Sequence, residues 1–66
     1  MIIVLKPEVR ENQLKDFVKR FEDMGLKTHV SRGDFVTIVG LIGDTSKVDI
    51  ESVRTLDAVE AVRRVS

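Results

Sequence analysis

The stretch "GLKTHVSRGDFVTIVGLIGD", residues 25–44, decides the fold because it holds two strand-like runs separated by a turn signal. Residues 26–32 alternate in character, as in a half-buried strand, and residues 35–42 form an apolar run of strand length. Between them, Gly33-Asp34 predicts a two-residue type II′ turn with glycine at the first central position. The stretch is therefore expected to form a β-hairpin.

A two-residue turn would fix which residues of the hairpin lie opposite one another. Directly opposed residues share a face of the sheet, and the expected pairs are Arg32 with Phe35, Ser31 with Val36, His29 with Ile38 and Lys27 with Gly40. The only histidine of the chain, His29, and Ser31 then share a face with Val36, Ile38 and Gly40. Glycine leaves a gap in such a face, which often marks close approach by a ligand or another backbone. This face suits a small amphipathic molecule, provided that a second wall closes over it.

The flanking segments predict a strand and a helix before the hairpin and a helix and a strand after it. Residues 1–6 are an apolar run stopped by proline, and residues 10–24 show the helical spacing of apolar residues, with Gly25 as a left-handed C-cap. Residues 46–49, "SKVD", resemble a capping box and predict a short helix. The last predicted strand covers residues 58–65. Its valines, Val59, Val62 and Val65, follow neither the spacing of a helix nor the alternation of a regular strand, which indicates a bulge.

The order βαββαβ predicts an α+β domain over residues 1–66 with the ferredoxin-like arrangement, a four-stranded antiparallel sheet with two helices on one face. The first and third strands are central in that arrangement. Both are apolar on their two faces here, although helices cover only one face. The second face is therefore expected to be covered from outside, by another copy or by an attached domain.

Composition excludes several classes of function. No cysteine and a single histidine leave no set of ligands for a thiolate or imidazole metal site. Eleven basic and eleven acidic residues balance, and aromatic residues are scarce, so a nucleic-acid binder is disfavoured. No segment has the length of a membrane span or a signal peptide, which favours a cytoplasmic protein. No side chain has a partner set for catalysis by this chain alone.

Four segments resemble a known family: "MIIVLKP" (1–7), "KTHVSRG" (27–33), "VGLIGD" (39–44) and "LDAVEAVRRV" (56–65). They are similar, in the same order and over the whole chain, to the N-terminal regulatory domain of the type Iβ 3-deoxy-D-arabino-heptulosonate 7-phosphate (DAHP) synthases of the shikimate pathway. The His-x-Ser pair of that family matches His29 and Ser31. Its Gly-x-x-Gly-Asp segment matches Gly40, Gly43 and Asp44.

The resemblance implies a ferredoxin-like domain fused ahead of a (β/α)₈ barrel that condenses phosphoenolpyruvate with erythrose 4-phosphate by means of a divalent metal. In regulated members the small domain takes up tyrosine or phenylalanine between domains of different subunits, and feedback inhibition follows. The expected partners are thus this effector, another copy and the barrel, with neither nucleic acid nor membrane. No cofactor is expected in these residues, which lack the barrel, and a domain excised from a longer chain is favoured over a free-standing sensor.

The open sheet face also admits a second interpretation. The domain could be a pure interaction module, whose apolar face serves dimerisation or docking without any ligand. A histidine on an exposed strand and a glycine in a strand are both compatible with that role. The residues alone leave the two interpretations open.

Overall fold

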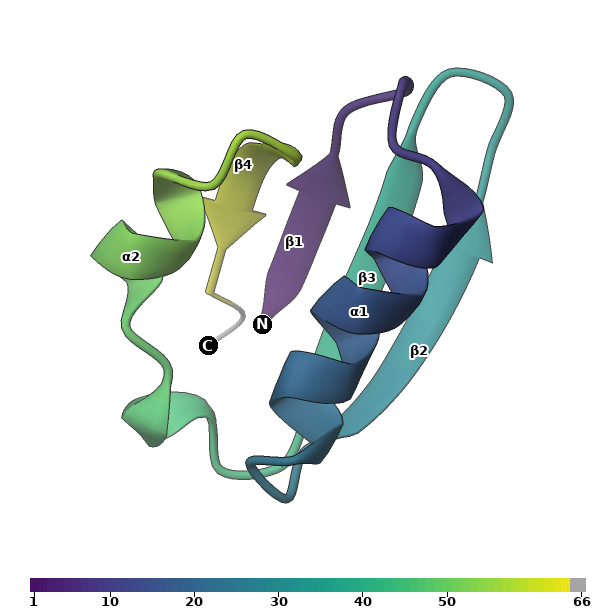
Figure 1. Ribbon diagram of the computed structural model, residues 1–66. Helices are drawn as coiled ribbons and strands as arrows, with labels where there is room; N and C mark the ends of the chain where they lie inside the picture. Colours follow the sequence, from purple (N-terminus) through teal and green to yellow (C-terminus); the bar gives the residue numbers. More distant parts are fainter. Residues whose placement is uncertain (65–66) are drawn as a thin grey trace.

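The computed structural model describes residues 1–64, which form four strands, two α-helices and a 3₁₀ helix. In chain order these are β1 (Ile2–Leu5), α1 (Glu11–Glu22), β2 (Lys27–Arg32), β3 (Thr37–Ile42), η1 (Thr45–Lys47), α2 (Ile50–Arg54) and β4 (Val59–Arg63). The strands form one antiparallel sheet in the order β2-β3-β1-β4, and α1 and α2 lie on one side of it (Figure 1). The predicted ferredoxin-like order and the two central strands are confirmed.

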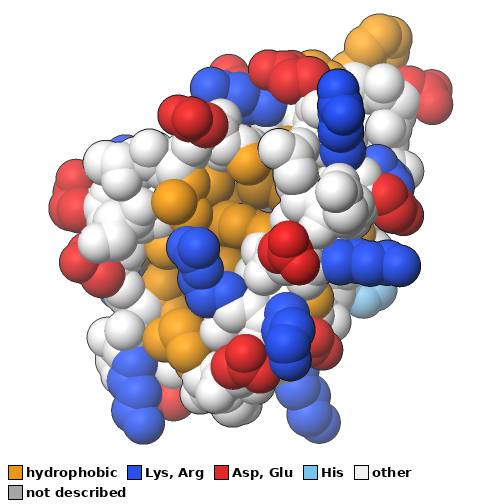
Figure 2. Space-filling model, in the orientation of Figure 1, with side chains coloured by type: hydrophobic (Ala, Val, Ile, Leu, Met, Phe, Trp, Pro, Cys, Tyr) orange, Lys and Arg blue, Asp and Glu red, His pale blue; other side chains and the backbone are white. Residues whose placement is uncertain are grey.

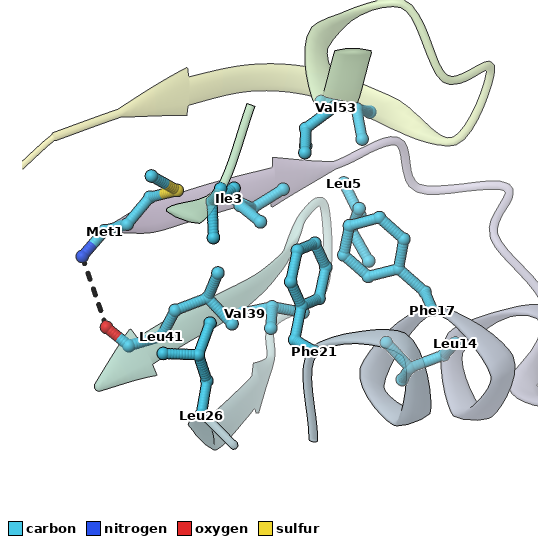
Figure 3. Packing of buried hydrophobic residues seen from close by; sticks show 12 residues of the cluster. Met1, Ile3, Leu5, Leu14, Phe17, Phe21, Leu26, Val39, Leu41 and Val53 are labelled. Carbon is cyan, nitrogen blue, oxygen red and sulfur yellow. Dashed lines mark hydrogen bonds between the residues drawn. The ribbon is translucent and has the colours of Figure 1, made fainter. Parts of the chain in front are cut away.

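The hydrophobic core lies between the sheet and α1 (Figure 3). Alternate residues of the central strands point into it, and Ile3, Leu5 and Val39 are completely buried. The helical spacing of α1 brings its apolar side chains to the same layer, where the rings of Phe17 and Phe21 meet edge to face with centroids 5.1 Å apart. Just before β1, the amino group of Met1 donates to the Leu41 carbonyl at 3.2 Å.

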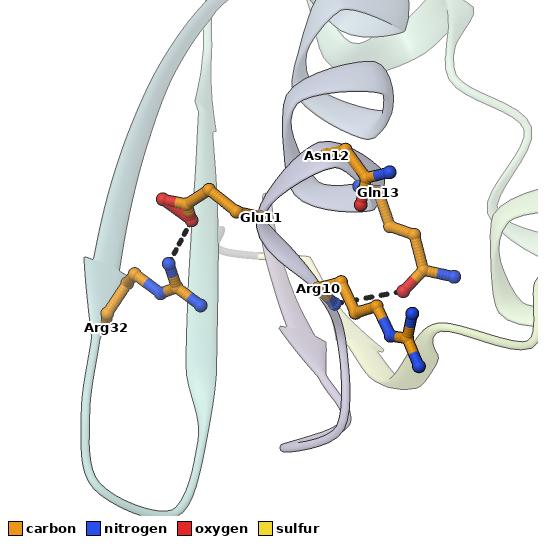
Figure 4. A network of polar contacts seen from close by, with 5 residues as sticks. All are labelled: Arg10, Glu11, Asn12, Gln13 and Arg32. Carbon is orange, nitrogen blue, oxygen red and sulfur yellow. Dashed lines mark hydrogen bonds and ion pairs between the residues drawn. The ribbon is translucent and has the colours of Figure 1, made fainter.

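Helix α1 has a defined beginning and end. The backbone N–H of Arg10 donates to the side-chain oxygen of Gln13 at 2.9 Å, which satisfies one donor at the helix start (Figure 4). After the helix, Gly25 has φ +87°, the left-handed conformation that the sequence predicted there. Within residues 1–64, no helix combines the length and the apolar composition that a bilayer crossing requires.

The second helix begins later than predicted, so the capping box assigned to residues 46–49 is wrong. Ser46 lies inside η1, and the buried Val48 that follows has an extended backbone, which separates η1 from α2. The N-cap of α2 is Asp49, whose side chain accepts from the backbone N–H groups of Glu51 (3.1 Å) and Ser52 (3.4 Å). Val48 and Val53 are both buried and pack in the core.

Strand β4 contains the predicted irregularity. Leu5 pairs with Val59, whereas the preceding Val4 pairs with Ala61, so Glu60 is an extra residue without a partner on β1. Both Val59 and Val62 pack on the core side of the sheet as a result. Val65, the third member of the valine pattern, lies outside the described residues.

Truncation of Phe21 is expected to remove most of the stability of the domain. Its side chain is only 1% exposed in the middle of the core, so Phe21→Ala should lower the free energy of unfolding by about 3–5 kcal/mol. Urea unfolding at low temperature, followed by circular dichroism, measures the loss. The control is Met24→Ala, because Met24 is 41% exposed at the next apolar position. Equal losses in the two variants would contradict this description of the core.

Candidate functional site

The hairpin forms, but its predicted register is wrong by two residues. The observed pairs are Arg32 with Thr37, Ser31 with Ile38, His29 with Gly40 and Lys27 with Ile42. Residues 33–36 form a four-residue loop in which the Gly33 N–H donates to the Val36 carbonyl at 2.8 Å. Gly33 does not have the positive φ that a type II′ turn requires. A slip of two residues keeps every side chain on its face, so the apolar pattern could not reveal the error.

The structure brings four of the predicted site residues together. His29 lies directly opposite Gly40, and Ser31 lies directly opposite Ile38. Opposed residues share a face, and this face points away from the helices, because the intervening Val39 is buried on the helical side. Val36 lies apart from them in the hairpin loop, before the first pair of the ladder.

We call this side of the sheet the open face. Strand pairing assigns to it Lys27, His29 and Ser31 of β2, Ile38, Gly40 and Ile42 of β3, Ile2 and Val4 of β1, and Ala61 and Arg63 of β4. Its centre is apolar, as predicted, and Ile42 is 60% exposed. Both helices lie on the other side of the sheet (Figure 1). Sequence reasoning missed Arg63, because only the pairing of all four strands places it on the same face as the hairpin residues.

The backbone conformation at position 40 does not require a glycine. Its φ lies outside the left-handed region, and a Cβ atom at this position would lie 3.7 Å from the His29 carbonyl oxygen and 3.9 Å from the His29 Cβ, which are ordinary contacts. Glycine inside a strand weakens the strand relative to residues with a side chain. The missing side chain therefore leaves a gap above the sheet beside His29 that the fold itself does not demand.

Gly43 and Asp44, in contrast, belong to the turn that follows β3. Gly43 has φ +126°, and a Cβ atom there would lie 3.2 Å from Cδ2 of Leu26. Asp44 caps η1: its carboxylate accepts from the Ser46 backbone N–H at 3.1 Å and from the Ser46 hydroxyl at 2.5 Å. Local structure accounts for both residues, and neither takes part in the strand pairs of the open face.

Three surface hollows lie elsewhere on the molecule. One of about 640 Å³ adjoins the start of α1, near Lys6, Arg10 and Asp57. A second, of about 280 Å³, lies between Phe17 and Leu56, where hydrophobic side chains are visible between the two helices (Figure 2). The third, of about 400 Å³, lies between α1 and β2. No residue of the open face lines any of these three hollows. A sheet surface with no second layer over it needs another wall to enclose a ligand.

An ion pair connects the end of β2 with the start of α1. The Arg32 guanidinium at the end of β2 contacts the Glu11 carboxylate at the start of α1 (Figure 4). Both side chains are about half exposed, so the pair contributes little free energy. No three His, Asp or Glu side chains within residues 1–64 are arranged to hold a metal ion.

The two glycines are expected to respond oppositely to alanine. Gly40→Ala should leave the free energy of unfolding unchanged or raise it by up to about 1 kcal/mol, because the side chain fits and the unfolded chain becomes less flexible. Gly43→Ala should lower it by about 1–3 kcal/mol through its strained φ and its contact with Leu26. Urea unfolding compares both with the wild type, and a larger loss at position 40 would refute the distinction.

Acid is expected to loosen the segment from η1 to α2. Hydrogen bonds from the Ser46 hydroxyl and backbone N–H lower the pKa of Asp44, and those from Ser52 lower the pKa of Asp49. A carboxyl whose pKa is lower in the folded state stabilises the fold above its unfolded pKa and loses that effect as the pH falls through the folded value. Unfolding free energy should therefore fall on acidification below the ordinary range of aspartate. Asp49→Asn, which keeps a capping oxygen without a charge, should flatten this pH dependence, and an unchanged profile would contradict the assignment.

Comparison with known proteins identifies the family. The family described as "DAHP synthase ferredoxin-like domain" matches residues 1–66. Phospho-2-dehydro-3-deoxyheptonate aldolase from Thermotoga maritima is 43% identical over 65 residues, which cover 98% of this chain and 19% of the relative. A crystal structure of the DAHP synthase from Thermotoga maritima superposes with a TM-score of 0.87 at 42% identity and the same coverage. The chain thus spans about a fifth of the length of these relatives, and it belongs to the DAHP synthase ferredoxin-like domain family.

Proposed function

We propose that this chain is the effector-binding regulatory domain of a DAHP synthase and that it binds tyrosine or phenylalanine on its open face, between two copies of the domain. One observation carries the proposal. The pairs His29–Gly40 and Ser31–Ile38 place two polar side chains next to an apolar, uncovered strand with a gap in it. Membership of the family supports a regulatory or accessory role for the domain.

The chemistry of the open face suits an aromatic amino acid. Ile38 and the gap at Gly40 offer an apolar floor on which a ring can lie flat. The His29 imidazole and the Ser31 hydroxyl can exchange hydrogen bonds with a polar group of the ligand, which would otherwise lose its bonds to water. Because both side chains are exposed, they are available to a ligand without any rearrangement of the sheet.

A second copy supplies the missing wall. The open face is shallow, and ligand pockets generally enclose most of the surface of their ligand. Two copies that face each other across the ligand would bury both apolar floors and the exposed Ile42 side chains. The effector then favours the paired arrangement by its own differential affinity for that arrangement, which is the requirement for allosteric control.

The aldolase reaction belongs to the remainder of the longer protein. The match covers 19% of the Thermotoga relative, and the proposed role of this fifth is to sense the effector. The catalytic barrel, with the divalent metal that it is expected to hold, is the part that the paired domains would control. Catalysis by residues 1–66 alone is not part of the proposal.

A ligand-independent interaction module is the second candidate. It is favoured by the 60% exposure of Ile42 at one end of the open face, an apolar surface that pairing would cover even without an effector. The two candidates differ in whether association of the domain depends on an aromatic amino acid.

Replacement of both polar side chains should weaken the response to the effector. We expect saturable amide shifts in a nuclear magnetic resonance (NMR) titration of the wild type with tyrosine or phenylalanine, centred on residues 29–31 and 38–40. His29→Ala with Ser31→Ala should weaken binding of the preferred ligand by about tenfold or more, the effect of losing one or two hydrogen bonds. The fold should persist, because both side chains are exposed.

Thr28→Ala is the matched control, since it lies on the same strand with its side chain on the helical side. It should bind the ligand as the wild type does. A double variant that binds normally would disprove the assignment of His29 and Ser31. A wild type that associates to the same extent with and without each amino acid, with no ligand-induced shifts, would favour the interaction module.

A further inference from the structure

We propose that Arg63 binds the α-carboxylate of the effector, so that the ligand lies across the strands from β2 to β4. This inference rests on the proposed function and adds to it the chemical group that the domain recognises: a carboxylate attached to an aromatic side chain. It assigns a binding role to β4, the strand farthest from His29 in the sheet.

The strand register places four open-face residues in one row. His29 pairs with Gly40, Gly40 pairs with Ile2, and Ile2 pairs with Arg63. The row therefore crosses all four strands in the order β2-β3-β1-β4. It has a polar side chain at one end, a cation at the other, and an apolar residue and a glycine between them.

Side-chain alternation puts Arg63 on the open face. Ile3 is completely buried on the core side, so its neighbour Ile2 faces the other way, and Arg63 is directly opposite Ile2. Val62, the residue before it, packs against the core, which agrees with this orientation. The Arg63 side chain is exposed, and the ion pairs formed among residues 1–64 all involve other residues.

The row is low at Gly40. Gly40 contributes no side chain, whereas the residues on either side of it on the same face of β3, Ile38 and Ile42, both do. A ring that lies over Gly40 would have His29 beside one edge. Its amino-acid end would then point along the row over Ile2.

The dimensions of the sheet suit this direction. Three strand spacings of about 4.8 Å separate β2 from β4, so the Cα atoms of His29 and Arg63 lie roughly 14 Å apart. The side chains of both residues reduce the span that a ligand must bridge. Arginine is well suited to the far end, because its planar guanidinium donates two parallel hydrogen bonds to a carboxylate.

Ligand analogues and variants at Arg63 test the inference. NMR titration of the wild type should show tyrosine binding more tightly than tyramine, which lacks the carboxylate. 3-(4-Hydroxyphenyl)propionate, which keeps the carboxylate but lacks the ammonium group, should still shift the Arg63 side-chain signals. For phenylalanine, the corresponding pair is phenethylamine and 3-phenylpropionate.

Arg63→Ala should weaken the binding of tyrosine or phenylalanine by about tenfold or more, whereas the weak binding of the matching amine should not change. Arg63→Lys should recover part of the affinity, because lysine keeps the positive charge but cannot donate two parallel hydrogen bonds to the carboxylate. Arg64→Ala is the matched control, since it removes the same charge at the adjacent residue beyond β4. It should bind as the wild type does.

Several results would overturn the inference. Normal amino-acid binding by Arg63→Ala would remove Arg63 from the site while leaving the proposed function intact. Equal losses in the Arg63→Ala and Arg64→Ala variants would show only a general effect of charge. If Arg63→Ala failed to fold, equal wild-type affinities for tyrosine and tyramine, and for phenylalanine and phenethylamine, would still exclude a carboxylate contact. A wild type that binds no aromatic amino acid would overturn the proposed function and this inference together.

Discussion

Burial of one side of the sheet under α1 is the constraint on which the rest of this domain depends. The apolar stripe of the helix, centred on Phe17 and Phe21, covers the core-facing residues of β1 and β3. Both helices lie on this side (Figure 1), so neither covers the second side of the sheet. The half-buried Ile2, Val4 and Ile38 on the uncovered side therefore remain available for another molecule.

The fold was predictable because the spacing of apolar residues differs between the helices and the strands. Apolar spacing located α1 and the two central strands, and Gly25 marked the end of the helix. The hairpin register and the start of α2 were predicted wrongly, because the spacing of apolar residues does not determine them. A hairpin slipped by two residues satisfies the same alternation, so the choice between Phe35 and Thr37 as the partner of Arg32 rests on the loop. Ser46 and Asp49 can both cap a helix, and in the structure Asp49 caps α2 whereas Ser46 lies inside η1.

The candidate site was predictable in part for a related reason. His29, Ser31, Ile38 and Gly40 come from one hairpin, so local alternation was enough to put them on one face. Arg63 joins them only through β1, whose pairing with β4 spans most of the chain and includes an extra residue. Gly43 and Asp44 entered through family resemblance, and the structure accounts for them through the turn and the cap at the end of β3. Their family match and their local role are compatible, because a fixed turn also fixes the end of the strand that carries Gly40.

The bulge in β4 changes which residues of that strand face the core. Counting by twos from the buried Val59 would put Ala61 and Arg63 on the core side, where a guanidinium beneath the helices would have to lose its hydration. The unpaired Glu60 shifts the count by one, so that Val62 packs inward and Arg63 turns outward. If Glu60 instead paired with Val4 in a regular strand, Ala61 would face the core and Arg63 would leave the open face without being mutated. Deletion of residue 60 would have no such effect, because Ala61 would then follow Val59 directly and Arg63 would still lie opposite Ile2.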